Sequence, residues 1–78
     1  MYIQYPELID PNLYEVIIGC KIRNRKSGLL EIIVTYENGV EERIWTYKAS
    51  KYTFNYLDFI GMTKIEAVFY CDRMPANR

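Results

Sequence analysis

The sequence predicts an α+β fold, namely a three-stranded antiparallel β-meander with a C-terminal helix packed on one face. Two segments rich in β-branched and aromatic residues, 29–36 and 41–47, flank the turn pair Asn38-Gly39. A third segment of this kind, 14–23, precedes them across a short polar connection. A helix-capping pattern near the C-terminal end of the chain predicts the helix. Strands followed by a helix are typical of an α+β domain.

The length of the chain limits it to one small domain. The 78 residues are expected to form a single globular unit over 1–78, in which 50% of the residues are apolar and 26% are charged. A domain of this size is expected to be stable by only ~5 kcal/mol. Pro6 and Pro11 each remove a backbone donor, so we expect an extended N-terminal segment at 1–13, with a turn at Asp10-Pro11-Asn12. The tail at 75–78 is expected to be frayed.

Residues 14–23 alternate in character as a first strand should. One side of this strand is predicted to carry Tyr14, Val16, Ile18, Cys20 and Ile22. Gly19 within the strand indicates either a β-bulge or a close backbone approach. The polar residues 24–28 form a connection short enough for a hairpin with a longer loop.

The pair Asn38-Gly39 predicts the geometry of the second hairpin. Two-residue type I′ turns prefer this pair, because both of their central residues need φ > 0. A two-residue loop also determines the register of the two strands. The predicted cross-strand pairs are Glu37–Val40, Tyr36–Glu41, Val34–Arg43, Ile32–Trp45 and Leu30–Tyr47.

This register gives the hairpin two different faces. The predicted core face carries Leu30, Ile32, Val34, Tyr36, Trp45 and Tyr47. The other face is mixed, with Ile33 opposite Ile44 at its centre and Val40 near the turn, and these three residues are the candidate partner-binding site. Two alternatives stay open. Residues 1–13 cover the isoleucines or they are simply tolerated at the surface, or a partner, including a second copy of the chain, covers them.

The segment 50–60 has two interpretations. Ser50 is placed to cap a helix that Gly61 would terminate in the left-handed region. Residues 52–54 are β-prone, however, so an irregular crossing is the alternative.

The last part of the chain carries the clearest helix signal. Thr63 and Glu66 have capping-box spacing, and Pro75 ends the pattern, which predicts a helix over 64–73. A strand is the competing interpretation, because 67–71 is a short apolar and aromatic run.

One basic cluster surrounds the predicted connection between the first two strands. The candidate nucleic-acid-binding residues are Lys21, Arg23, Arg25 and Lys26. Cations there would bind phosphate, and nearby tyrosines would stack on bases. Ten basic and ten acidic residues nevertheless give a net charge of zero, whereas a nucleic-acid-binding domain usually has a basic excess. The simpler interpretation is therefore a solvated turn, and nucleic acid is the disfavoured partner.

The sequence offers little support for an enzyme. It has no histidine, glycine-rich phosphate loop or metal motif, so we expect no catalytic residues, cofactor or metal. Cys20 and Cys71 lie in apolar surroundings, where a thiol is inert, and reduced thiols are favoured over a disulfide. With no apolar run of membrane-spanning length and no signal peptide, the expected location is the cytoplasm.

The predicted function is a small non-catalytic protein-interaction module. Eight tyrosines support this prediction, since tyrosine is favoured in protein interfaces. An abundance of residues with AT-rich codons indicates an AT-rich genome, such as that of a low-GC bacterium or one of its phages. The two-faced sheet, the tyrosines and the missing catalytic groups then predict an accessory or inhibitory protein of such a bacterium or phage. Binding of nucleic acid through the basic turn is the alternative function.

Overall fold

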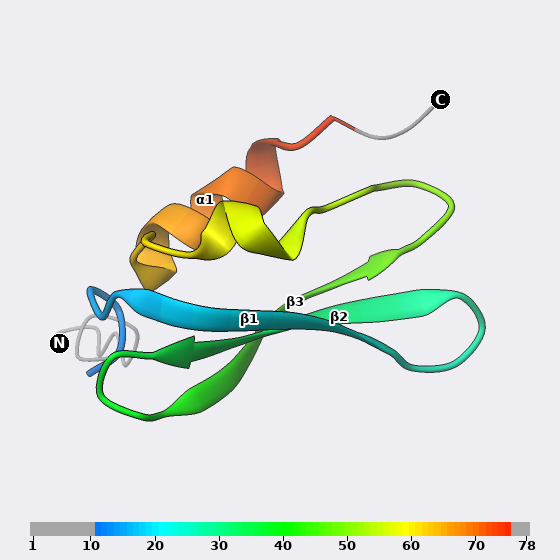
Figure 1. Ribbon diagram of the computed structural model, residues 1–78. Coiled ribbons are helices and arrows are strands. Elements are labelled where there is room, and N and C mark those ends of the chain that lie inside the picture. Colours follow the sequence, from blue (N-terminus) through cyan, green and yellow to red (C-terminus); the bar gives the residue numbers. More distant parts are fainter. Residues whose placement is uncertain (1–10, 76–78) are drawn as a thin grey trace, which may run out of the picture.

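A computed structural model of the chain describes residues 11–75 and confirms the predicted α+β fold (Figure 1). The elements are β1 (Ile17–Asn24), β2 (Leu29–Tyr36), β3 (Glu41–Lys48), the 3₁₀ helix η2 (Tyr56–Phe59) and the helix α1 (Lys64–Arg73). The three strands form one antiparallel sheet in the order β1-β2-β3. Predictions for residues 1–10 and 76–78 lie outside the described part of the chain.

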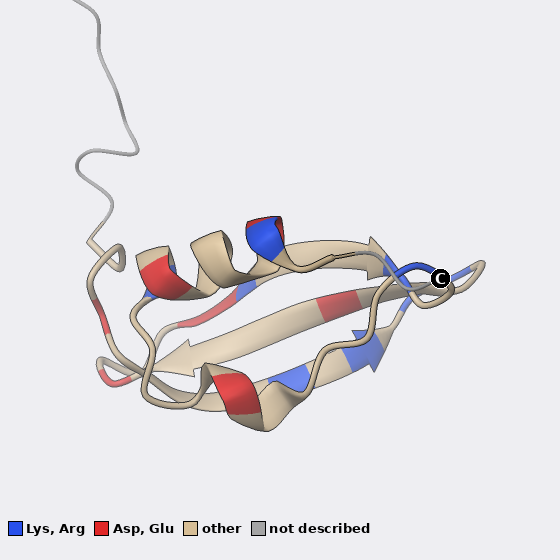
Figure 2. Cartoon of the chain, turned by 90° about the horizontal axis from the view of Figure 1, so that it is seen from above, with Lys and Arg blue, Asp and Glu red and all other residues tan. Residues whose placement is uncertain are grey.

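The fold has two layers. α1 and η2 lie on the same face of the sheet, which we call the inner face (Figures 1 and 2). η2 contacts β1, and α1 contacts β3. The opposite face, which we call the outer face, is not covered by any helix or strand formed by residues 11–75.

The core lies between the sheet and the helical layer. Its buried members are Ile17, Ile32, Val34, Tyr36, Tyr47, Phe54, Phe59, Ala67 and Cys71. Phe54 is at the centre of the aromatic contacts, with its ring centroid 4.8 Å from Tyr47, 6.1 Å from Phe59 and 6.2 Å from Tyr70. All six predicted core residues of the hairpin either belong to this cluster or pack against it, which confirms the predicted core face.

A β-bulge interrupts β1 at Ile18, where the register shifts between Ile17 and Gly19. Ile17 consequently points into the core and is 0% exposed, while Ile18 is 55% exposed. The sequence predicts Ile18 on the same side as Cys20 and Ile22. This prediction is wrong, because a bulge adds one unpaired residue to a strand. The bulge predicted from Gly19 is confirmed.

The strand also begins later than predicted. Residues 11–14 form a turn, and Val16 bridges to Thr63 instead of to β2. The Ile17 N–H then donates to the Met62 carbonyl at 2.7 Å. The first part of the predicted strand is therefore held by the segment that precedes α1.

The turn between β2 and β3 contains three residues, so the predicted two-residue type I′ turn is wrong. The Gly39 N–H donates to the Tyr36 carbonyl, and the Tyr36 N–H donates to the Val40 carbonyl, both at 2.9 Å. Gly39 has a φ of 90°, whereas Asn38 has no positive φ. This is a type I turn followed by a G1 bulge. Asn38 acts through its side chain, which accepts from Val40 N–H and donates to Asn12.

A second bulge, at Ile44 in β3, compensates for the extra turn residue. The longer turn shifts the pairing by one residue, and the bulge shifts it back. The pairs beyond the bulge, Leu30–Tyr47 and Ile32–Trp45, are therefore as predicted. Those nearer the turn are wrong, because the observed pairs are Ile33–Arg43, Val34–Glu42 and Thr35–Glu41 instead of the predicted Val34–Arg43, Tyr36–Glu41 and Glu37–Val40.

The segment 50–60 is irregular apart from η2. The capping residue is Asn55 and not Ser50, and its side-chain oxygen accepts from the Leu57 N–H at 2.9 Å. Gly61 has a φ of 94°, in the left-handed region as predicted.

The capping box of α1 is present. The Thr63 side chain accepts from the Glu66 N–H, and the Glu66 carboxylate accepts from the Thr63 N–H at 2.9 Å. The predicted helix over 64–73 is confirmed, and the strand alternative is wrong.

We predict that Gly39→Ala lowers the free energy of unfolding by about 1 kcal/mol, because an L side chain is strained at a φ of 90°. Urea denaturation followed by Trp45 fluorescence measures this loss. Gly19→Ala is the matched control, since a Cβ added there meets the Thr35 Cβ at 3.5 Å, an ordinary contact. Equal losses in the two variants would contradict the assigned turn geometry.

Candidate functional site

The outer face is strongly cationic. Among residues 11–75, the charged side chains that the strand register and the Glu31 ion pairs place on this face are the cations Lys21, Arg23, Arg25, Arg43 and Lys48 and the carboxylates Glu31 and Glu41. Five cations against two carboxylates leave an excess of three positive charges, although the chain as a whole has a net charge of zero. Figure 2 shows an acidic band in the central strand and basic bands in the strands beside it. The neutral total hides this segregation of charge.

Glu31 organises the centre of this face. Although it lies on the outer side of β2, only 3% of it is exposed. The Arg23 Nη2 and Nε atoms lie 2.6 and 3.0 Å from one carboxylate oxygen. Arg43 Nη1 and Arg25 Nε lie 3.4 and 3.7 Å from the other. The side chains of Arg23, Arg43 and Arg25 remain 62, 55 and 48% exposed, respectively. They therefore form a charged cover over a buried carboxylate.

The electrostatics of Glu31 follow from these contacts. Hydrogen bonding from Arg23 lowers the pKa of the Glu31 carboxyl, and Arg43 and the nearby positive charges add to this effect. Desolvation acts in the opposite direction but is outweighed. Glu31 is therefore ionised at neutral pH.

The structure brings together part of the predicted basic cluster. Arg23, Arg25 and Lys26 line one shallow depression together with Glu31, Leu29 and Asn24. Lys21 lies apart from it and pairs with Glu41 at 3.5 Å. Sequence reasoning missed Glu31 and Arg43. A short connection between the first two strands places Arg23 opposite Glu31, so this pair could have been predicted from the sequence. The position of Arg43 depends on the bulge in β3 and could not.

The three residues of the predicted partner-binding site do not form one surface. Ile33 is only 6% exposed and lies between Lys21 and Arg43 on the outer face. Ile44 is at the bulge and packs against the core of the inner face, so its predicted position opposite Ile33 is wrong. Val40 is exposed at the turn. The bulge therefore separates residues that simple alternation placed together.

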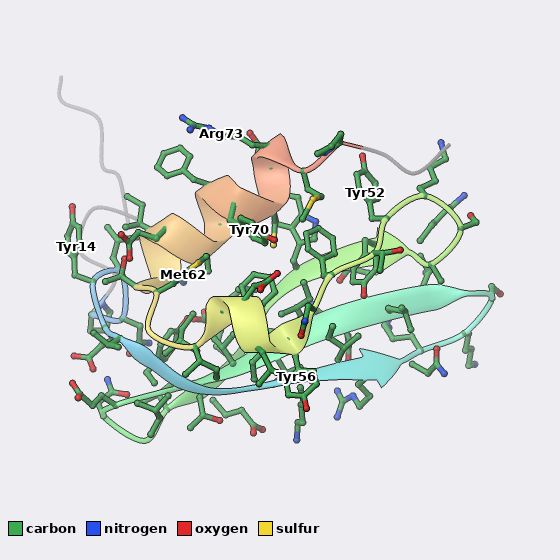
Figure 3. The ribbon with its side chains drawn as sticks, turned by 45° about the horizontal axis from the view of Figure 1, so that its top comes forward. Tyr14, Tyr52, Tyr56, Met62, Tyr70 and Arg73 are labelled. Carbon is green, nitrogen blue, oxygen red and sulfur yellow. The ribbon has the colours of Figure 1, made fainter. Side chains whose placement is uncertain are left out.

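A different apolar surface runs along β1. Four exposed large side chains lie on its bulge and on the adjacent η2 segment, and we call them the β1 seam: Ile18, Tyr56, Leu57 and Ile60. The Gly61 N–H donates to the Ile17 carbonyl, which places Ile60 beside the bulge. Tyr56 lines a depression with Cys20, Lys21 and Ile22, and Figure 3 shows it beside β1.

β1 is an edge strand, and beyond Ile17 no backbone group of residues 11–75 is hydrogen-bonded to its side away from β2. The Arg25 N–H donates to the Leu29 carbonyl, so Arg25, Arg23 and Lys21 direct their backbone groups toward β2. The alternate residues, Cys20, Ile22 and Asn24, direct their N–H and carbonyl groups away from the sheet. The β1 seam therefore lies next to a row of backbone groups available for pairing.

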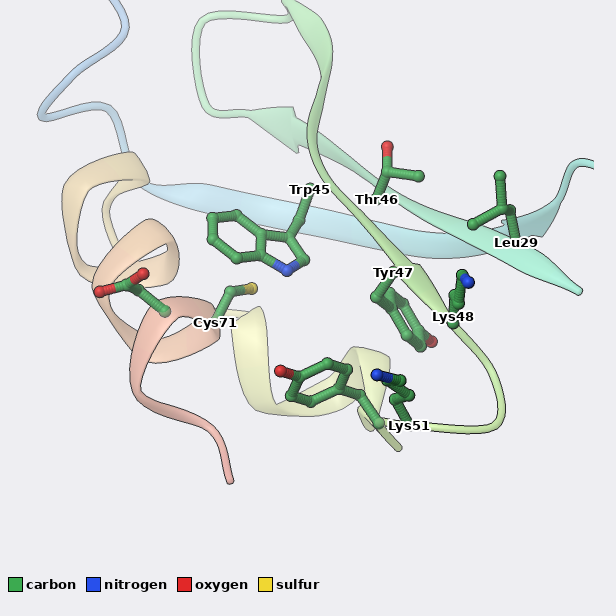
Figure 4. Close-up of a pocket in the computed structure, with 9 residues that line it drawn as sticks. Leu29, Trp45, Thr46, Tyr47, Lys48, Lys51 and Cys71 are labelled. Carbon is green, nitrogen blue, oxygen red and sulfur yellow. The ribbon is translucent and has the colours of Figure 1, made fainter. Parts of the chain in front are cut away.

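Neither cysteine has the properties of a nucleophile. Both are free thiols, and burial raises the pKa of Cys20 to about 11 and that of Cys71 to about 12. Cys71 lines a pocket with Trp45, Tyr47, Tyr52 and other residues of β3 and the loop after it (Figure 4). A thiol in this setting is protonated at neutral pH and behaves as a small apolar side chain.

Residues 11–75 contain neither a cluster of metal ligands nor a helix suited to cross a membrane. These residues contain no group of three His, Cys, Asp or Glu side chains that could hold a metal ion. None of their helices has the length and apolar character needed to cross a membrane. No protein family, curated protein or solved structure matches the chain.

We predict that Glu31→Gln lowers the urea midpoint at pH 7, because three guanidinium groups lose their shared counter-charge. The pKa of Glu31 is lower in the folded state than its ordinary value of 4.5, so its contribution is present above that pH and is lost as the pH falls through the folded-state pKa. The difference between wild type and variant should therefore shrink below pH 4.5.

Glu41→Gln is the control for this measurement. The Glu41 carboxylate pairs with Lys21 in an exposed setting, and exposed ion pairs contribute little to stability. A wild-type to Glu31→Gln difference that is the same at pH 3 and pH 7 would show that the carboxylate charge is not what stabilises the outer face.

Proposed function

We propose that this chain is a small non-catalytic protein-interaction module that binds an extended segment of its partner along the free edge of β1. The observation that carries the proposal is the β1 seam, which places exposed apolar side chains beside unpaired backbone groups. Strand addition uses both features, since main-chain hydrogen bonds supply affinity and alternate side chains supply specificity.

The two sides of the edge specify the partner segment. Side chains of an added strand that point to the inner face would lie next to η2, where Tyr56 and Leu57 are exposed, so apolar residues fit there. Side chains that point to the outer face would lie next to Lys21 and Arg23, so acidic residues fit there. The segment that best matches this edge alternates apolar and acidic residues.

The same geometry favours a different chain over a second copy. If two β1 strands paired antiparallel about Ile22, their free backbone groups would match, but Lys21 of each copy would lie opposite Arg23 of the other. Like charges directly opposite each other destabilise a strand pair. Self-association through this edge is therefore disfavoured.

The wider setting of this function is an inference from composition and thiol chemistry. Two free cysteines support a reducing compartment, for which the cytoplasm is the proposed location. An accessory or inhibitory protein of a bacterium or phage remains our proposal for the biological role.

We predict that Leu57→Glu abolishes capture of the partner from an extract of the source cells, with immobilised protein as the bait. Leu57 is 60% exposed, so the substitution leaves the core intact. Phe69→Glu is the matched control, because Phe69 is 53% exposed but lies on α1, away from the β1 seam. In the complex, the amides of Cys20 and Ile22 should become protected from hydrogen exchange.

Two results would contradict the proposal. One is a protein that sediments strictly as a monomer and captures no partner. The other is a partner retained equally by wild type, Leu57→Glu and Phe69→Glu, with no new protection at the β1 edge.

A further inference from the structure

A second surface, separate from the β1 seam, has the chemistry of an anion site. We infer that Arg23, Arg25 and Arg43, held around Glu31, form a binding site for a phosphate group. We call these four residues the arginine cluster. The inference concerns the outer face and does not rest on strand addition at β1.

The arginine cluster has more donors than its own carboxylate can use. Three guanidinium groups carry fifteen N–H donors, whereas an ionised carboxylate offers about four acceptor positions. Arg23 directs Nε and Nη2 to a single Glu31 oxygen, and Arg43 directs one nitrogen to the other oxygen. Among residues 11–75, no second carboxylate lies within ion-pair distance of these arginines. The remaining donors face solvent on half-exposed side chains.

The net charge of the cluster matches a phosphate monoester. Three guanidinium charges and one carboxylate charge sum to two positive charges, and a phosphate monoester carries about −1.5 to −2 at pH 7. Guanidinium groups also fit phosphate in geometry, because their paired N–H donors match its oxygens. Lys26 lines the depression formed by Arg23, Arg25 and Glu31 and adds a further cation there.

Burial of Glu31 explains why its own negative charge does not repel such a ligand. Only 3% of Glu31 is exposed, so an approaching anion meets the guanidinium groups first. The carboxylate also holds side chains from two strands and a turn near one point before the ligand arrives. Groups that are already positioned lose less conformational freedom on binding, which favours affinity.

The phosphate could belong to either of two sources with the same chemistry, a phosphate monoester or the backbone of a nucleic acid. A backbone phosphate carries one negative charge, so the charge match is better for a monoester. The outer face also carries no aromatic side chain in β1, β2 or β3 on which bases would stack, since the aromatic residues of these strands belong to the core side.

The test is a titration of the protein with inorganic phosphate at constant ionic strength, followed by the NMR signals of the arginine Nε–H groups. We expect saturable shifts at Arg23, Arg25 and Arg43. Arg43→Gln should weaken binding at least tenfold, whereas Lys48→Gln, which removes the same charge from the same face outside the cluster, should weaken it less than twofold. Arg25→Gln, in an exposed turn, repeats the test if Arg43→Gln affects folding.

A second titration distinguishes the two sources. If a short single-stranded oligonucleotide displaces phosphate and loses affinity in Arg43→Gln, nucleic acid supplies the phosphate. If it does not displace phosphate, nucleic acid is excluded as the source and the monoester is retained. The inference is overturned if sodium chloride produces the same shifts as phosphate, or if Arg43→Gln and Lys48→Gln weaken binding equally. Either result leaves the outcome of the Leu57→Glu experiment unaffected, so the two proposals fail independently.

Discussion

The structure depends on the burial of β2 on both of its faces. Four consecutive residues of this strand, 31–34, are buried, although only the inner face of the sheet is covered by helices. On the inner face, Ile32 and Val34 belong to the core. On the outer face, arginine side chains of the neighbouring strands and turn cover Glu31. Ile33 is also buried there and lies between Lys21 and Arg43 in the sheet. Long charged side chains on neighbouring strands can cover a central strand on a face that no helix covers.

That constraint also explains the chemistry of the outer face. A buried carboxylate is costly unless it is paired and hydrogen-bonded, and Glu31 therefore needs the arginines that surround it. Because one carboxylate draws three guanidinium groups together, the requirement for stability creates a local excess of positive charge. The same contacts that bury β2 thus produce the surface that we assign to phosphate. Structure and proposed binding share one set of interactions.

The two edge strands have a different role, because their bulges decide which side chains reach the surface. The bulge at Ile18 exposes an isoleucine next to η2 and gives its core position to Ile17. The bulge at Ile44 draws an isoleucine toward the core and places Arg43 opposite Ile33. The first bulge exchanges two isoleucines, whereas the second moves an isoleucine toward the core and an arginine to the outer face. The exposed apolar β1 seam, which we propose as the partner surface, consequently lies along β1, and the outer face carries most of the charged side chains of the sheet.

The sequence by itself determined the number and order of the strands, the capping box of α1 and the core face of the hairpin. These features depend on short-range signals, such as the spacing of Thr63 and Glu66 or the alternation around Ile32. Only the tertiary structure decided the register near Asn38-Gly39 and the composition of both candidate surfaces. A bulge shifts the alternation of a strand by one residue, and its position depends on how the strand packs against the whole core. The position of Arg43 beside Glu31 therefore becomes visible only when all three strands are in place.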